Sequence, residues 1–412
     1  MSGKGGEERN RSETVSESES ARDDRSELLE DLLAGNHRAL ARTITEIEDR
    51  APGYRELVSD LHAHTGDADV IGITGSPGSG KSTLVDRMAE HYRAEGLTVG
   101  IIGIDPSSPF TGGAVLGDRI RMSSTTGDME VFFRSMSARG SLGGLSTATA
   151  DAVKALDAFG KDKVIIETVG AGQNEIDIVK TADTVCVLVP PGSGDDVQML
   201  KAGILEIGDL FVVNKADLDG ADRTVVELRE MIEGRSDRLS TLDADHHDRS
   251  ERGDRNGAAG RTDNGTDTSS GAQAEEPSGD GPVTTVQEQG TDESNEDEEP
   301  EPESEPWTPQ VLETVAKSGE GVEEFLETLT AHREHLESSG RLERQLRNRY
   351  AEEIRALLRE DSSALVEREL AARGGIDAYL DRVMDNETDP YAVAEAIVGP
   401  LRECVEDRRE EE

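Results

Sequence analysis

The stretch GSPGSGKST at residues 75–83 has the residue types and spacing of a loop that binds phosphate groups. It follows the apolar run VIGIT and precedes a segment of helical pattern, which is the context that this motif requires. Glycines let backbone N–H groups surround a β-phosphate, while Lys81 would reach the β- and γ-phosphate oxygens and Ser82 would ligate Mg²⁺. A glycine-rich turn with a chance lysine is the alternative, but the chain has only nine lysines. The predicted phosphate-binding residues are Gly75, Ser76, Pro77, Gly78, Ser79, Gly80, Lys81, Ser82 and Thr83.

A second motif, NKAD at residues 214–217, ends the apolar run DLFVVN and could bind a nucleotide base. The carboxylate of Asp217 can accept from both N1–H and the exocyclic amine of guanine, whereas adenine has no donor at N1. Asn214 would brace the loop near N7, and the stem of Lys215 would lie against the base. Asn and Asp are also ordinary turn residues after a strand. Together with the phosphate loop, the motif predicts a site that selects GTP over ATP.

The segment TVAK at residues 314–317 follows a further apolar run and is a weaker candidate for contacting the same base. The backbone N–H of Ala316 could donate to guanine O6. The segment could equally be an ordinary loop.

The motif ETVGAGQNE at residues 167–175 ends the apolar run KVIIE. An acidic residue at such a strand end can orient the shell of a metal ion, and Gly170 would then contact the γ-phosphate. The acid here is Glu167, where Asp-x-x-Gly is the more familiar pattern, and a solvated strand end is the alternative. Gln173 could orient the attacking water, although a glutamine at a helix start is usually only solvated.

Two aspartates flank a loop rich in Ser, Pro and Gly. Asp105 ends one predicted strand and Asp118 follows within the segment PSSPFTGGAVLGD. Because parallel strands present their carboxyl ends at one edge of a sheet, Asp105 should lie near the phosphates. Mg²⁺ prefers carboxylate and water oxygens, so both aspartates are predicted to be switch residues that order around Mg²⁺ and the γ-phosphate. The alternatives are an ordinary long connection and, for Asp118, a helix N-cap.

Short, fully apolar runs alternate with helix-length segments from residue 69 onward. This pattern is typical of a mostly parallel sheet that is covered by helices on both faces. The fold class predicted is therefore a doubly wound α/β core, with a helical lead-in before it and helices after it. The predicted strands are DVIGIT, TVGIIGID, VFFRSM, KVIIET, TVCVLVP, DLFVVN and a last one within PQVLET.

Changes in composition divide the chain. The stretch at 234–306 is rich in Gly, Ser, Thr, Asp and Glu, and no Lys or Arg occurs between Arg261 and Lys317. Such a segment cannot bury enough apolar surface to offset its chain entropy. The helices near the end could pack on a partner subunit or on the core, and the sequence slightly favours the core. The predicted segments are a disordered tail at 1–25, a helical segment at 26–66, the core at 67–233, a disordered insertion at 234–306, the end of the core at 307–339, and terminal helices at 340–412.

The overall composition excludes several classes of function. A net charge of −44 opposes general binding to nucleic acids or anionic membranes. The excess of 88 acids over nine lysines is typical of surfaces solvated in concentrated salt, so we expect the cytoplasm of a halophile. No run approaches the length of a membrane span. Cys186 and Cys404 form no CxxC motif, which argues against a disulfide framework or a thiolate metal site.

With these motifs in order, the sequence resembles the MeaB/ArgK family of P-loop GTPases, the methylmalonyl-CoA mutase-associated chaperones. The resemblance rests on GITGSPGSGKSTL, IDPSSPFTGGAVLGDRIRM, ETVGAGQNE, VPPGSGDDVQMLKAGILEIGD and NKAD, and it covers about residues 26–233 and 307–400. It implies a GTPase, with GTP or GDP and Mg²⁺ as its ligands, that binds an adenosylcobalamin-dependent acyl-CoA mutase, gates cofactor loading and protects or repairs the mutase. It also implies Mg²⁺-linked acids at Asp105, Asp118 and Glu167.

The resemblance further implies a homodimer formed through the C-terminal helices, and a mobile segment in which Asp195 and Lys201 couple the nucleotide state to the mutase. The acidic insertion and TVAK depart from the family pattern, and TVAK makes the assignment of Ala316 less secure. Two other functions remain open: a kinase-like ATPase serving amino-acid transport, which Asp217 disfavours, and a metal-insertion GTPase for a nickel enzyme. The latter should carry a His-rich tract or CxxC, and His246–His247 is too little.

Overall fold

The computed structural model of this 412-residue chain describes residues 22–105, 127–137, 144–168, 181–192, 204–234 and 306–411. The chain divides into two units, Met1–Ile232 with Pro306–Glu412 and Glu233–Glu305. Almost all of the second unit, and with it the predicted insertion, lies outside the described residues. Within the described ranges, no helix combines the length and the apolar character that crossing a membrane would take.

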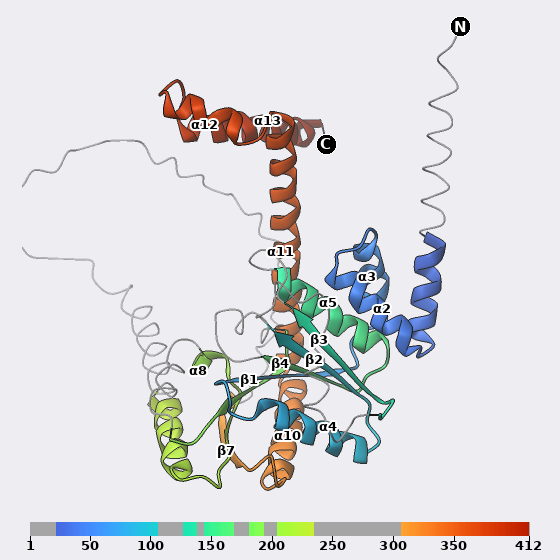
Figure 1. Cartoon of the computed structure of the whole chain (residues 1–412), viewed down its shortest axis with the longest axis vertical. Helices are drawn as coiled ribbons and strands as arrows, with labels where there is room; N and C mark the ends of the chain where they lie inside the picture. The colour runs from blue at the N-terminus through green and yellow to red at the C-terminus, as the bar shows by residue number, and fades with distance from the viewer. Residues whose placement is uncertain are drawn as a thin grey trace, which may run out of the picture. The chain divides into compact units, whose positions relative to one another are not determined.

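Seven strands form one sheet in which every pairing is parallel, as the alternation of apolar runs and helices predicts (Figure 1). The order β3-β2-β4-β1-β5-β6-β7 places β1 near the middle, with crossovers to both sides. The predicted α/β fold class is confirmed. The strands are β1 (Asp69–Gly75), β2 (Val99–Asp105), β3 (Val131–Ser137), β4 (Lys163–Thr168), β5 (Thr184–Val189), β6 (Leu210–Asn214) and β7 (Gln310–Thr314).

Helices cover both faces of the sheet (Figure 1). On one face α2 (His37–Glu48), α3 (Tyr54–His62), α5 (Gly144–Ala158) and a helix at 221–234 share one core with the strands. On the other face α4 (Lys81–Ala94) and α10 (Val322–Ser338) share a second core. Side chains alternate along β4, because Val164 and Ile166 join the first core while Ile165 joins the second. This double burial explains the continuous apolar runs in the sequence. A short helix, α8 (Ile204–Ile207), precedes β6.

The helical lead-in begins earlier than the sequence indicates. A helix spans residues 22–33, so four residues assigned to the tail are helical. Arg25 explains the difference, because its guanidinium donates to Gly53 O at 3.3 Å and lies 3.5 Å from the Glu56 carboxylate. Gly35 separates this helix from α2 and has a φ of +83°, which a glycine adopts without strain.

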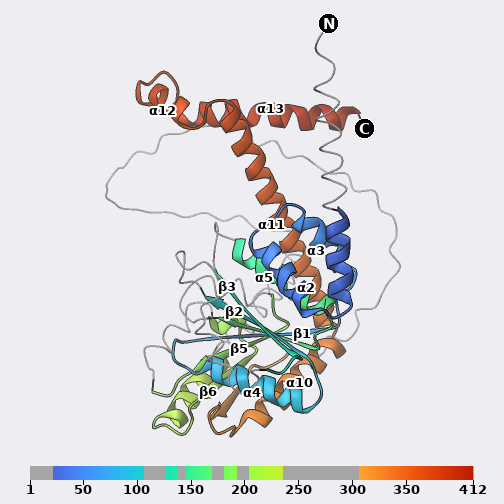
Figure 2. The ribbon, with the colours of Figure 1, turned by 45° about the vertical axis from the view of Figure 1, so that its right-hand side comes forward.

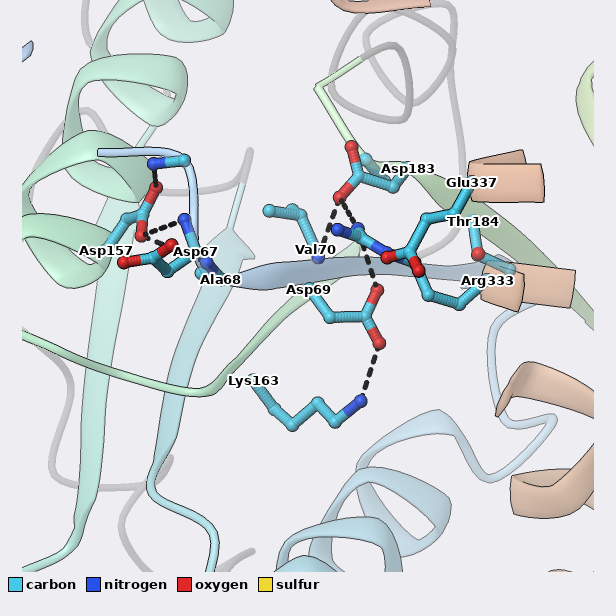
Figure 3. Close-up of polar contacts among 12 residues, drawn as sticks. Asp67, Ala68, Asp69, Val70, Asp157, Lys163, Asp183, Thr184, Arg333 and Glu337 are labelled. Carbon is cyan, nitrogen blue, oxygen red and sulfur yellow. Dashed lines mark hydrogen bonds and ion pairs between the residues drawn. The ribbon is translucent and has the colours of Figure 1, made fainter. Parts of the chain in front are cut away.

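A buried ionic network lies at the amino ends of the strands (Figure 3). Arg333 of α10 lies 2.9 Å from Asp183 and 3.6 Å from Asp69, and Lys163 pairs with Asp69 at 2.7 Å. Asp183 also accepts from the backbone N–H of Val70 at 3.1 Å. Because each buried carboxylate has a cationic partner, the network joins α10 to three neighbouring strands without leaving an isolated charge.

The helix α11 (Arg341–Ala372) contacts the core from its start as far as Asp361 (Figure 2). Arg349 pairs with Asp183 at 2.9 Å, Glu353 with Lys154 of α5, and Asp361 with Arg55 of α3 at 2.6 Å. The chain continues through α12 (Asp377–Met384) and α13 (Pro390–Glu411). Arg373 Nη1 donates to Ala396 O at 2.7 Å, which fastens α13 to the end of α11. The ion pairs named here between the terminal helices and the core all come from α11.

Candidate nucleotide site

The predicted phosphate loop lies between the end of β1 and the first turn of α4, at the carboxyl edge of the sheet. Gly75 must be glycine, since its φ is +134° and a Cβ there would lie 2.0 Å from Leu188 O. Gly80, the N-cap of α4, has a φ of +96° and its side chain position is filled by the Asn214 amide, 2.3 Å from an added Cβ. Gly80 has no side chain that could cap the first turn of α4. Its N–H groups can therefore bind an anion.

Lys81 lies over this loop, and its side chain is buried. Its ammonium donates to the carbonyls of Gly75 at 2.7 Å and Ser76 at 3.0 Å. These contacts keep the positive charge beside the backbone amides that would surround a phosphate. The predicted role of Lys81 at the β- and γ-phosphates stays a prediction.

Ser82 and Glu167 lie next to each other, although 85 positions separate them in the sequence. The Ser82 hydroxyl donates to Glu167 Oε1 at 2.5 Å, because α4 begins beside the carboxyl end of β4. A hydroxyl and a carboxylate are the oxygen donors that Mg²⁺ prefers, so these residues fit the predicted metal. Among the described residues, no group of three or more His, Cys, Asp or Glu side chains could hold a metal ion.

Asn214 connects three loops at the end of β6, and its side chain is buried. Its Nδ2 donates to Ser79 O at 2.7 Å in the phosphate loop. Its Oδ1 accepts from Thr314 Oγ1 at 3.1 Å and from the backbone N–H of Ala316 at 3.0 Å. The amide therefore aligns the TVAK segment with the phosphate loop.

Lys215 and Asp217 of the NKAD motif are exposed. Lys215 has a φ of +65°, and its ammonium donates to Gly78 O at 2.7 Å. Its stem therefore crosses from the base motif to the phosphate loop. Asp217 stands three residues after Asn214 on the same edge of the sheet, and its predicted contact with guanine stays a prediction.

The N–H of Ala316 is occupied by Asn214, so guanine O6 would have to share or replace that acceptor. Sequence reasoning missed Thr314, whose hydroxyl contacts Asn214, although it stands first in the TVAK segment. It also missed Arg87, which donates to the carbonyls of Ala316 and Lys317 from α4. No local motif marks Arg87, because its partners come some 230 positions later in the chain.

For several predicted residues, the side chain or the whole residue lies outside the described part of the chain. Asp105 ends β2, where its backbone pairs with Ser137 at the carboxyl edge of the sheet, and its side chain is not among those described. The other predicted residues that lie outside the described ranges are Asp118, Gly170, Gln173, Asp195 and Lys201.

The all-parallel sheet, the GSPGSGKST loop between β1 and α4, and the contact between Ser82 and Glu167 define a P-loop nucleoside triphosphatase. A family model described as methylmalonyl Co-A mutase-associated GTPase MeaB matches residues 40–371. The chain belongs to this family and is a GTPase.

Comparisons with known proteins agree with this assignment. A protein of Pyrococcus abyssi, named as a candidate GTPase, is 41% identical over 375 residues, which are 91% of this chain and 96% of the relative. GTPase ArgK of Escherichia coli is 37% identical over 206 residues, 49% of this chain and 62% of ArgK. A crystal structure titled LAO/AO transport system kinase superposes with a TM-score of 0.54 at 22% identity, covering 92% of this chain and 97% of the other. The last similarity supports the fold alone.

Proposed function

We propose that this GTPase is a chaperone for an adenosylcobalamin-dependent acyl-CoA mutase of the methylmalonyl-CoA mutase type. It would gate loading of the cofactor and protect or repair the mutase. The observation that carries the proposal is the match over residues 40–371 to a family described by its association with that mutase. The linked phosphate and base motifs support a GTP-driven role.

In the proposed site, the phosphate loop and Lys81 bind the triphosphate while Asn214, Lys215 and Asp217 bind guanine. The base loop at 314–317 would complete the site, with Ala316 beside O6. Asp217 gives the preference for GTP, because its carboxylate accepts from the two donors that guanine presents on one edge. Ser82 and Glu167 would hold Mg²⁺, with Asp105 and Asp118 nearby, and this ion would supply charge neutralisation on the phosphates when bound.

Hydrolysis requires water to attack the γ-phosphorus while the bond to the bridging oxygen of the β-phosphate breaks, which releases GDP and phosphate. The Lys81 ammonium and the amino end of α4 supply positive charge for the phosphate oxygens. No arginine occurs in residues 75–83 or 167–175, and Gln173 would be the residue that orients the water. Intrinsic turnover should therefore be slow, and a partner that completes the site can raise the rate of such GTPases by roughly 10³ to 10⁵.

The proposed assembly is a homodimer formed through the terminal helices. The second half of α11, α12 and α13 have exposed apolar side chains, which in a monomer would remain in contact with water. A second copy of this surface could cover them. These side chains are Leu365, Ile376, Leu380, Met384, Tyr391, Val398 and Val405.

The proposal is tested by assaying GTP hydrolysis in molar KCl with and without an adenosylcobalamin-dependent mutase from the same cell. We expect the mutase to raise the rate of GTP hydrolysis at least tenfold. Lys201→Ala should weaken the stimulation and spare basal hydrolysis. The Lys81→Ala chain mixed with the mutase is the control for contaminating GTPases. Equal rates with and without the mutase, and no complex on gel filtration, would leave a GTPase with another partner.

A further inference from the structure

Arg87 of α4 binds the loop that carries Ala316. Its Nε donates to Ala316 O at 3.2 Å and its Nη2 donates to Lys317 O at 3.1 Å. The third guanidinium nitrogen, Nη1, donates to Glu90 at 2.6 Å. One side chain therefore holds two successive carbonyl groups of the base loop.

The peptide groups around Ala316 are held from two directions. Asn214 Oδ1 accepts the N–H of Ala316, while Arg87 donates to its carbonyl oxygen. On the far side the loop closes on itself, since the N–H of Val315 donates to Glu320 O at 2.9 Å. The orientation of the Ala316 amide thus depends on contacts from both β6 and α4.

The helix that supplies Arg87 is also the helix that begins at the phosphate loop. Arg87 comes six positions after Lys81, which corresponds to about 9 Å along the helix axis. A rigid helix of this length sets the distance between the phosphate-binding end and the base loop. A nucleotide that binds both the phosphate loop and the base loop would have to match this distance.

We propose that Arg87 is a positioning residue for base recognition, which holds the Ala316 amide where it can meet the O6 atom of a guanine-type base. The inference rests on the proposed guanine specificity of the site. In this role Arg87 need contact neither the base nor the phosphates. It acts through the loop at 314–317.

The proposed site makes two distinct contacts with the base, and different nucleotides can test each contact separately. GTP and ITP both carry O6, which the Ala316 amide would bind, but only GTP carries the exocyclic amine that Asp217 would bind. ATP has an amino group in place of O6. A change confined to the Ala316 loop should therefore affect GTP and ITP alike and leave ATP unaffected.

The experiment measures affinities for GTP, ITP and ATP by competition against a fluorescent GDP in molar KCl, for the full chain and its variants. Arg87→Met keeps much of the apolar stem and removes the donors. It should weaken GTP and ITP by the same factor of about tenfold, as expected for loss of a hydrogen bond from a charged donor, and leave ATP unchanged. Arg87→Lys should give an intermediate loss.

Glu90→Gln is the matched control, because it alters the third partner of Arg87 and leaves both carbonyl contacts in place. Its three affinities should equal those of the unmodified chain. Partial unfolding would lower all three affinities equally, so the GTP/ATP ratio reports on the loop alone. Equal losses for all three nucleotides in Arg87→Met, or no loss, would overturn the role of Arg87. An unmodified chain that does not prefer GTP to ATP would instead overturn the proposed guanine specificity, and this inference with it.

Discussion

Asn214 shows how one buried amide can organise a binding site. Its two polar atoms bond to Ser79 O, the Thr314 hydroxyl and the Ala316 N–H, which belong to segments far apart in the chain. A buried donor or acceptor left without a partner costs about 1–3 kcal/mol, so these three contacts also fix the side chain itself. Gly80 is necessary beside it, because any Cβ at that position would collide with the amide.

Lys81→Ala should abolish nucleotide binding. The substitution removes the ammonium that would neutralise the β- and γ-phosphates, and only the amino end of α4 and the proposed Mg²⁺ would supply the remaining positive charge. Isothermal titration with GTP in molar KCl checks this, and the melting temperature of the variant shows whether the loop still folds without the bonds to Gly75 O and Ser76 O. Micromolar affinity for GTP in a folded variant would contradict the assignment of this loop.

Asp217→Asn should move the preference of the site from guanine to xanthine nucleotides. The carboxylate is exchanged for an amide that offers a donor, which suits the O2 of xanthine better than the exocyclic amine of guanine. Because the Asp217 side chain is exposed, the substitution should leave the folded core unchanged. Competition between GTP and XTP measures the effect, and an unaltered GTP/XTP ratio would show that another residue selects the base.

Two titratable groups with opposite shifts meet where α10 packs on the strands. Burial raises the pKa of Asp209 to about 6, although the Val185 N–H donates to its carboxylate at 2.8 Å. Burial also lowers the pKa of His332 to about 4, with Thr184 Oγ1 2.8 Å from its Nδ1. The two side chains lie 3.6 Å apart, and the Trp307 ring stacks edge-on against the histidine.

These shifts have opposite consequences for stability. Because folding favours protonated Asp209, its contribution is present below the unfolded pKa, near 4, and is lost as the pH rises to about 6. Folding favours neutral His332, so its contribution is present above the unfolded pKa, near 6.5, and is lost as the pH falls to about 4. In the unmodified chain the two dependences largely offset each other.

Single substitutions should reveal each dependence. Relative to the unmodified chain, Asp209→Asn should lose stability as the pH falls from 6.5 towards 4, because the contribution of His332 is no longer offset by that of Asp209. His332→Gln should lose stability as the pH rises from 4 to 6, because the contribution of Asp209 is no longer offset by that of His332. Denaturant unfolding at several pH values in that range, at constant KCl, measures both slopes. Two variants with the pH slope of the unmodified chain would show that burial shifts neither group.

The acidic segment and the strand that follows it belong to different units of the chain. The segment forms a separate unit, Glu233–Glu305, while the strand that follows it is attached to the core. Trp307 Nε1 donates to Asp209 O at 3.0 Å, and β7 pairs with β6 from Gln310 to Thr314. The chain is thus fixed in the sheet immediately after the segment ends.

Deleting residues 240–300 should leave GTP hydrolysis and the melting temperature almost unchanged in high salt. Its composition offers few apolar side chains that a core could bury. Hydrolysis assays and thermal unfolding of the deleted and full chains in molar KCl test this. Loss of cooperative unfolding in the deleted chain would assign the segment a structural role.

The sequence predicted the parts of the site that depend on short-range pattern. Apolar runs such as KVIIET are long enough to identify buried parallel strands, and GSPGSGKST specifies its own backbone through glycines that tolerate positive φ. The first helix begins at residue 22, earlier than the sequence predicts, because Arg25 is held by contacts with Gly53 and Glu56 that no local pattern reveals.

What the tertiary structure alone decided is which distant residues meet. The alternating pattern determined that parallel strands would bring their carboxyl ends to one edge, and so determined the location of the site. The order of the strands determined the rest: β4 lies beside β1, which brings Glu167 to Ser82, and β7 lies beside β6, which brings Thr314 to Asn214. Arg87 could not be found from the sequence, because a hydrogen bond to a backbone carbonyl leaves no mark on the residue type of its partner.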